Sequence, residues 1–249
     1  MTGNEVGMDH LNYNPNYSKW FLTKVKQAIK EYRMIEKNDH VTIGLSGGKD
    51  SISLAFILSL LKKYSHMDFQ LTAINIHPGW EVDNRPLAEF CQLLEIPFYE
   101  EKTQIFEIVF HTRKEKNPCA LCSNLRRGTL VQTARKIGAN KLALGHHGDD
   151  AIETFLLNST MGGKLNSFTP VVFYPDTGIS IIRPLIYLRE KTIISLSRKE
   201  NFPVQASPCP LDKKTKREDM KKLLCEMEKA VPNCGDSLLT ALKDRWRQE

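Results

Sequence analysis

The residues best suited to chemistry form one short segment rich in glycine, hydroxyl and charged side chains. The segment consists of Ser46, Gly47, Gly48, Lys49, Asp50 and Ser51. Its two glycines let the backbone turn sharply and approach a ligand closely, and its two serines offer hydroxyl groups. Lys49 adds a mobile positive charge that suits a phosphate group. Because Asp50 would repel phosphate unless a cation lay between them, we interpret Asp50 as a contact for Mg²⁺.

The flanking sequence favours a phosphate-binding loop over an ordinary turn, which is the alternative. An apolar run, residues 41–45, precedes the segment, and an apolar helix-like run follows it. Unpaired N–H groups at the start of such a helix attract an anion. The loop is not of the Walker A type, because the residue five positions after Gly44 is Lys49 and not glycine.

The hexapeptide SGGKDS resembles the PP-loop of the N-type ATP pyrophosphatases. This resemblance implies that ATP is cleaved to AMP and pyrophosphate, and that the AMP group activates an oxygen atom for replacement. It also implies that the six residues of the loop contact ATP.

A second group of candidate residues consists of cysteines. Cys119 and Cys122 form a C-x-x-C motif, which suits a redox dithiol, half of a zinc site or part of an iron–sulfur site. No second C-x-x-C exists, so a zinc site built from two such motifs is excluded. Cys209 lies between two prolines, which hold the backbone extended and keep it out of a helix. A thiol on such a stiff loop suits a ligand better than a core residue.

Three cysteine ligands leave two interpretations open. In a four-iron cluster, three thiolates leave one iron without a protein ligand, and that iron could bind an exogenous sulfide. The cluster would then carry sulfur rather than electrons. Alternatively, the three thiolates hold a zinc ion that only stabilises the fold.

Five segments together resemble the tRNA 2-thiocytidine synthetase family of PP-loop tRNA thiolases. They are SGGKDS (46–51), CALCSNLRRG (119–128), LALGHHGDDAIET (142–154), RPLIYLREK (183–191) and FPVQASPCP (202–210). The resemblance extends from about residue 20 to residue 225. One departure is Asp212, three residues after Cys209, where the family often has a further thiol.

The resemblance implies a specific reaction and set of cofactors. ATP and Mg²⁺ activate the C2 oxygen of a cytidine in tRNA, and sulfur from sulfide or a cysteine desulfurase persulfide replaces it. Cys119, Cys122 and Cys209 hold a [4Fe–4S] cluster and, with Asp50, are the catalytic residues. The resemblance also implies a homodimer. The alternatives are a lysidine-type tRNA ligase without a cluster, a thiolase for another substrate, and a metal or redox sensor that is not an enzyme.

The segment GHHGDD (145–150) contains two histidines and two carboxylates at the end of a predicted strand. Such a group suits a metal site, an acid–base pair or a helix cap. We expect Asp149 or Asp150 to cap the next helix and the other to hold Mg²⁺ or the nucleotide, and we assign His146 and Asp150 to nucleotide binding. Further candidates for contacts with phosphate or the tRNA backbone are Arg126, Arg127, Arg183, Lys213, Lys214, Lys216, Arg217, Lys221 and Lys222.

The elements that position these residues alternate between strand and helix. Strands are predicted at 41–45, 71–76, 96–100 and 141–145, a hairpin or crossover at 167–182, and helices at 17–37, 52–64, 86–94, 124–137, 150–158, 188–201, 213–228 and 237–247; residues 105–110 are ambiguous. This order predicts an α/β fold with a doubly wound parallel sheet and helical extensions at both ends. The loops at Ser46, His77 and His146 should then converge on one site.

We divide the chain into an N-terminal helical segment (1–40), a nucleotide-binding α/β domain (41–200), and a C-terminal extension with the cysteine loop and a basic helix (201–249). The 249 residues carry a net charge of +6, which permits a polyanionic partner. No apolar run is long enough to cross a membrane, and residues 1–20 do not have the pattern of a signal peptide. We therefore expect a cytoplasmic protein, and poor order in residues 1–16.

Overall fold

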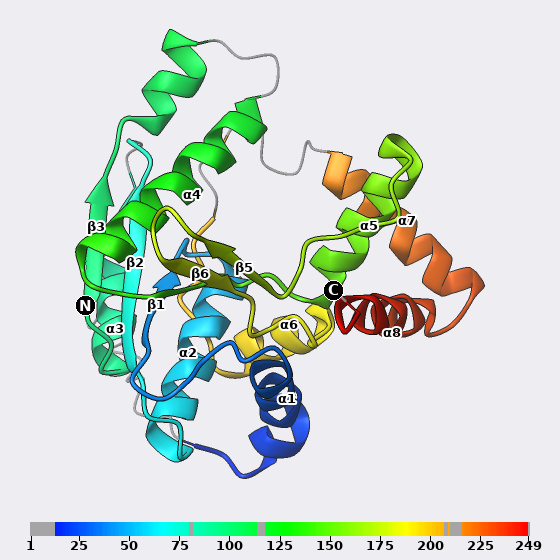
Figure 1. Cartoon of the computed structure of the whole chain (residues 1–249), viewed down its shortest axis with the longest axis horizontal. Coiled ribbons are helices and arrows are strands. Elements are labelled where there is room, and N and C mark those ends of the chain that lie inside the picture. The colour runs from blue at the N-terminus through cyan, green and yellow to red at the C-terminus, as the bar shows by residue number, and fades with distance from the viewer. Residues whose placement is uncertain (1–12, 80–81, 114–117, 207–208, 210–215, 249) are drawn as a thin grey trace, which may run out of the picture.

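The computed structural model describes residues 13–79, 82–113, 118–206, 209 and 216–248. Its centre is a six-stranded sheet in the order β3-β2-β1-β4-β6-β5, parallel except for the edge strand β5 (Figure 1). The strands are β1 (His40–Gly44), β2 (Gln70–His77), β3 (Phe98–Lys102), β4 (Lys141–Ala143), β5 (Val171–Tyr174) and β6 (Ile179–Ile182).

Helices cover both faces of the sheet. They are η1 (Ser18–Leu22), α1 (Thr23–Glu31), α2 (Lys49–Tyr64), α3 (Arg85–Leu93), η2 (Glu107–Thr112), α4 (Pro118–Lys136), α5 (Gly148–Gly162), α6 (Glu190–Lys199), α7 (Lys216–Ala230) and α8 (Cys234–Trp246), with η1 and η2 of the π type. Figure 1 shows α4 across the sheet from α1 and α2. Successive side chains of β2 point to opposite faces of the sheet. Leu71 and Ala73 belong to the hydrophobic cluster on the α2 face, and Ile74 and Ile76 belong to the cluster on the α4 face.

The strand order reverses between β1 and β4. From β1 the chain moves outward through β2 to β3, and it then returns to place β4 on the other side of β1. In open α/β sheets a ligand crevice forms at such a point, outside the carboxyl ends of the strands. The loops that follow β1 and β4 therefore meet at this crevice.

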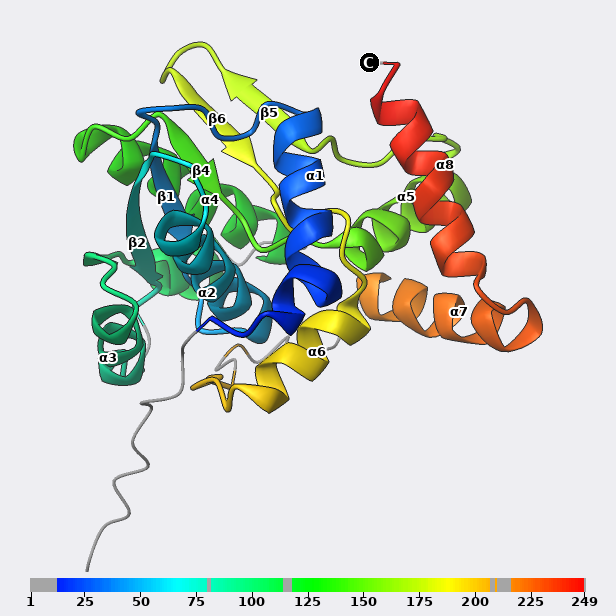
Figure 2. The same ribbon diagram turned by 90° about the horizontal axis from the view of Figure 1, so that it is seen from below.

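Helices α5, α7 and α8 form a group beside the sheet, in which α5 packs against both of the others (Figure 1). The last turn of α8 also reaches the end of α1, since Arg247 Nε lies 2.5 Å from Glu31 Oε1. Figure 2 shows these two helices near one another. One hydrophobic cluster contains side chains from α1, the sheet and α8, so the proposed N-terminal, central and C-terminal segments share a core.

Most predicted elements are confirmed to within a few residues, including the antiparallel hairpin of β5 and β6. The ambiguous residues 105–110 lie largely in η2. Two predictions were wrong in a boundary: the helix expected to reach residue 37 ends at Glu31, and the helix expected from residue 124 begins at Pro118, so that Cys119 and Cys122 lie in its first turns. The poor order expected for residues 1–16 falls mostly outside the described residues. Within those residues, no helix combines the length and apolar character needed to cross a bilayer.

Candidate active site

A cavity of about 620 Å³ lies at the carboxyl ends of β1 and β4. It is lined by three groups of residues proposed from the sequence. They are Ser46, Asp50 and Ser51 of the phosphate loop; Cys119, Cys122 and Cys209; and His146, Asp150, Arg126, Arg127, Arg183 and Arg217. One cavity thus joins the phosphate loop to the three thiols.

The phosphate loop is held in a sharp turn by its own serines and by a distant segment. Ser46 N–H donates to Ser51 Oγ at 3.1 Å, and the Ser51 hydroxyl donates to the Gly48 carbonyl at 3.0 Å. Gly47 has a φ of +82°, and a Cβ there would lie 2.6 Å from Gln205 Oε1, so only glycine fits. Gln205 N–H donates to the Gly47 carbonyl at 2.9 Å. The segment that leads to Cys209 therefore packs directly on the phosphate loop.

Gly145 brings the loop after β4 against the start of α2. A Cβ on Gly145 would lie 2.9 Å from the carbonyl carbon of Asp50 and 3.0 Å from Ser51 N. Any larger side chain would push the two loops apart. This close approach places His146 and His147 beside the phosphate loop.

Lys49 lies between two carboxylates. Its Nζ is 3.1 Å from the Asp50 carboxylate and 3.0 Å from Glu190 Oε1. Burial acts to lower the pKa of Lys49, but these two carboxylates raise it above its ordinary value. Lys49 is therefore positively charged, and a phosphate group can replace one of the two carboxylates as its partner.

Asp50 has the features expected of a Mg²⁺ ligand. Among the described residues, its Oδ1 is one of two buried side-chain oxygens or nitrogens without a hydrogen bond. His147 Nε2 lies 3.6 Å from this oxygen, and Lys49 approaches it in a poor direction for a hydrogen bond. A buried carboxylate oxygen with spare lone pairs beside a phosphate loop fits a hard cation.

His147 and Asp150 cap α5 reciprocally. His147 N–H donates to Asp150 Oδ2 at 2.9 Å, and Asp150 N–H donates to His147 Nδ1 at 3.3 Å. Nδ1 accepts this hydrogen bond, and the other ring nitrogen, Nε2, lies 3.6 Å from Asp50 Oδ1. Burial opposes ionisation of Asp150, but His147 and Arg217 hold its pKa below the ordinary value. The expected capping carboxylate is thus Asp150, which also lines the cavity.

Asp149, the other carboxylate of the pair, does not line the cavity. Both of its oxygens accept hydrogen bonds from Arg189, at 2.9–3.1 Å, and Oδ2 also accepts from Glu190 N–H at 2.6 Å. Its hydrogen-bonding capacity is used within the protein, so the geometry favours Asp150 over Asp149 for contact with Mg²⁺ or the nucleotide. Arg189, Glu190 and His147 are residues whose roles the sequence did not reveal.

His146 is a neutral imidazole on the cavity wall. Burial lowers its pKa to about 4. Arg183 Nε donates to His146 Nδ1 at 3.2 Å, and the Arg183 guanidinium lies 4.9 Å from the centre of the Phe168 ring. Arg183 also donates to the Thr169 carbonyl at 2.7 Å, which fixes the group.

The three thiols come from two segments and face the same cavity. Cys119 and Cys122 lie on α4, and Cys209 lies in the loop between α6 and α7. Burial raises the pKa of Cys122, and the nearby Arg126 opposes this shift. Cys209 and Cys119 are close enough to Cys122 to raise its pKa as well. No three of the described His, Cys, Asp and Glu side chains stand close enough to ligate one metal ion. Because each thiolate of an iron–sulfur cluster binds a different iron, three thiols lining one cavity are a donor set that fits such a cluster, and Arg126 beside them suits its negative charge.

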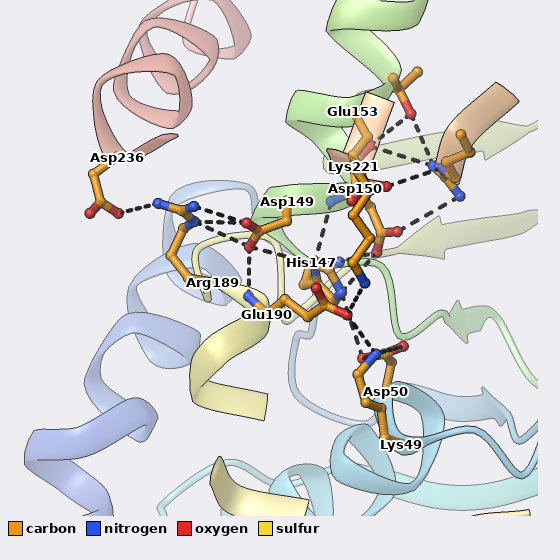
Figure 3. A network of polar contacts seen from close by, with 12 residues as sticks. Lys49, Asp50, His147, Asp149, Asp150, Glu153, Arg189, Glu190, Lys221 and Asp236 are labelled. Carbon is orange, nitrogen blue, oxygen red and sulfur yellow. Dashed lines mark hydrogen bonds and ion pairs between the residues drawn. The ribbon is translucent and has the colours of Figure 1, made fainter. Parts of the chain in front are cut away.

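Two expectations about other residues are only partly met. His77 does not line the cavity, and its Nδ1 accepts a hydrogen bond from Gly79 N–H. Of the basic stretch, Lys213 and Lys214 lie outside the described residues, and Lys216 and Lys222 are exposed. Arg217 contacts carboxylates of α5. Lys221 contacts Glu190 of α6 (Figure 3).

Glu153 gives this site a testable dependence on pH. Burial and the neighbouring Asp150 raise its pKa from 4.5 to about 7, although Arg217 opposes the shift. Between these values the folded state binds the proton that the unfolded state has released, so stability falls as pH rises. Glu153→Gln should not lose stability in this way, because glutamine does not titrate. The free energy of unfolding of the variant minus that of the wild type should therefore increase from pH 4.5 to about pH 7 and stay constant above it. Urea denaturation across this range measures it, with the exposed Glu226→Gln as control; equal slopes for Glu153→Gln and wild type would contradict the assignment.

Comparison with known proteins shows which family the chain belongs to. Residues 18–227 match the PP-loop domain family. The tRNA-cytidine(32) 2-sulfurtransferase of Pelobacter propionicus is 37% identical over 226 residues, covering 88% of this chain and 83% of that protein. The enzyme of the same name from Citrifermentans bemidjiense is 38% identical over 225 residues, covering 89% and 88%.

Solved structures show the same fold. The U34-tRNA thiolase NcsA from Methanococcus maripaludis, solved with its [4Fe–4S] cluster, has a TM-score of 0.74 at 23% identity, with 91% of this chain and 78% of that chain covered. The NH3-dependent NAD synthetase from Campylobacter jejuni is more distant, with a TM-score of 0.51 at 17% identity and 95% of each chain covered. The chain therefore belongs to the PP-loop family and, within it, to the tRNA 2-thiocytidine synthetases, which are enzymes of tRNA thiolation.

Proposed function

We propose that this protein is an ATP-dependent tRNA sulfurtransferase that replaces the C2 oxygen of a cytidine in tRNA with sulfur. The observation that carries the proposal is the single cavity lined by both the phosphate loop and the three thiols. The relatives named tRNA-cytidine(32) 2-sulfurtransferase support the choice of cytidine.

In the first half of the reaction, the cytidine C2 oxygen attacks the α-phosphorus of ATP and displaces pyrophosphate. The N–H groups of the phosphate loop and Lys49 bind the phosphates, and Lys49 exchanges its carboxylate partners for them. Asp50, whose Oδ1 has no hydrogen bond, would hold Mg²⁺. Bound Mg²⁺ supplies charge neutralisation for the phosphate oxygens.

In the second half, sulfur bonds to C2 and AMP leaves with the former C2 oxygen. Cys119, Cys122 and Cys209 would hold a [4Fe–4S] cluster. Such a cluster with three protein thiolates supplies one iron that can bind sulfide. The physiological donor is sulfide, which balances this step directly, or a desulfurase persulfide, whose outer sulfur is released at the sulfide level only with a two-electron reductant such as a thiol. His146 is neutral at working pH, so it does not repel the arginines of the cavity.

The RNA contributes a polyanionic backbone and one base that enters the cavity. The nucleotide that is modified would rotate out of the RNA stack so that its base enters the cavity. Arg126, Arg127 and Arg183 line the cavity and suit the phosphates beside this nucleotide. The exposed Lys216 and Lys222 suit backbone contacts outside it. The proposal includes a cytoplasmic homodimer, with residues 41–200 as the nucleotide-binding domain and the flanking segments as its extensions.

The proposal predicts a specific product pattern. Anaerobically purified protein should release pyrophosphate from labelled ATP only when tRNA is present, and should form AMP over many turnovers only when sulfide is added as well. Lys49→Met should weaken nucleotide binding about 10-fold or more, because a charged hydrogen bond to phosphate is lost. Lys62→Met, on the exposed last turn of the same helix, should bind nucleotide normally. Formation of ADP instead of AMP would contradict the proposal.

A further inference from the structure

Glu190 is held in one position by the residues around its backbone. It is the first residue of α6, and its N–H donates to Asp149 Oδ2 at 2.6 Å. Asp149 is fixed in turn by Arg189, which donates from Nε to Oδ2 and from Nη2 to Oδ1 and whose guanidinium also contacts Asp236 (Figure 3). The Glu190 carboxylate therefore projects from a rigid support.

The side chain of Glu190 lies between two lysines from different parts of the chain. Its Oε1 is 3.0 Å from Nζ of Lys49 and 2.7 Å from Nζ of Lys221 (Figure 3). Burial acts to raise the pKa of Glu190, but both lysines hold it below the ordinary value, and the N-terminus of α6 also favours the negative charge. One carboxylate oxygen is thus shared by the phosphate-loop lysine and a lysine of α7.

We propose that Glu190 is a positioning residue that couples nucleotide occupancy to the docking of α7. The inference rests on the proposed function, because it requires Lys49 to bind phosphate. When a triphosphate takes Lys49, the Glu190 carboxylate is left with Lys221 alone. The ion pair between Glu190 and Lys221 becomes stronger when Lys49 no longer competes for the same carboxylate oxygen. Helix α7, which carries Lys221, is then held more firmly against α5 and α6.

A second cation of α7 lies beside this ion pair. Arg217, one turn before Lys221, lies 3.7 Å from Asp150 and 3.6 Å from Glu153 on α5, so Arg217 and Lys221 both face carboxylates near the cavity. Thermodynamic reciprocity then requires that any ligand favouring docked α7 also tightens nucleotide binding. An RNA that binds the exposed lysines of α7 would be such a ligand, so ATP and tRNA would bind with positive cooperativity.

The test is hydrogen–deuterium exchange of α7 with and without the magnesium complex of α,β-methylene-ATP, which resists cleavage at the bond that is broken. In the wild type, nucleotide should slow exchange in α7 by about fivefold or more. Glu190→Gln should abolish this slowing. The same variant should bind nucleotide about threefold more tightly, because a competing anion for Lys49 is gone. A merely structural role for Glu190 would instead weaken nucleotide binding.

Two lysines of α7 provide a matched pair of variants. Lys221→Met should remove the response of α7, whereas Lys222→Met, at the exposed neighbouring position, should retain it. If wild-type α7 does not respond although nucleotide binds, or if Glu190→Gln responds like the wild type, the inference is wrong and the proposed function is unaffected. If the wild type binds no nucleotide, the proposed function itself fails.

Discussion

Arg189→Met should lower the free energy of unfolding by about 3–5 kcal/mol, because it leaves a buried carboxylate without its partner. The Arg189 guanidinium is 6% exposed and contacts three carboxylates, those of Asp149, Glu228 and Asp236. Methionine fills a similar volume but neutralises none of them. Urea denaturation followed by circular dichroism measures the loss.

A control and a double-mutant cycle separate the ion pair from general effects of the substitution. Arg198→Met, at an exposed position in the last turn of α6, should change stability by less than about 0.5 kcal/mol. Arg189→Met combined with Asp149→Asn should cost less than the sum of the two single changes, because the unpaired charge is removed. Additive losses would show that Asp149 is not the main partner of Arg189.

Cys209→Ala should remove the cluster and abolish thiolation while leaving nucleotide binding intact. A cluster ligated by three cysteines has no replacement donor at that position, and loss of one ligand exposes its iron to solvent. Anaerobically purified wild type should contain about four iron and four sulfide per chain, with the absorption of an iron–sulfur protein. The variant should lose both, together with sulfur incorporation into tRNA.

The matched control is Cys225→Ala, which changes an exposed cysteine on α7 outside the cavity. It should keep full iron and sulfide content. An active wild type that contains zinc or no metal would contradict the prediction. It would favour a ligase-type reaction in which Cys119 and Cys122 are structural thiols.

The strands next to the site were predictable because each is a short apolar run that ends in a distinctive loop. Residues 41–45 and 71–76 match β1 and β2 within one residue at each end. The start of α4 was missed because its first turns lack apolar periodicity. Pro118 was an available signal, since proline is favoured in the first turn of a helix.

The residues of the phosphate loop and the three cysteines were recognisable from local spacing, whereas the charge network around them was not. Asp149 meets Arg189 across 40 positions of sequence, and Lys49 at the start of α2 meets Glu190 at the start of α6, far along the chain. Nothing local to Glu190 indicates either contact. His147 was missed as a cap because histidine is not among the usual N-cap residues.

The contact between Glu31 of α1 and Arg247 of α8 has a consequence for synthesis of the protein on the ribosome. These residues are 216 positions apart, and chains elongate at about 5–20 residues per second, so about 10–40 s pass between them. During that time the sheet and the phosphate loop emerge before the end of α1 has met α8. The part of the shared hydrophobic core that α8 contributes is therefore completed only after the rest of the chain has been made.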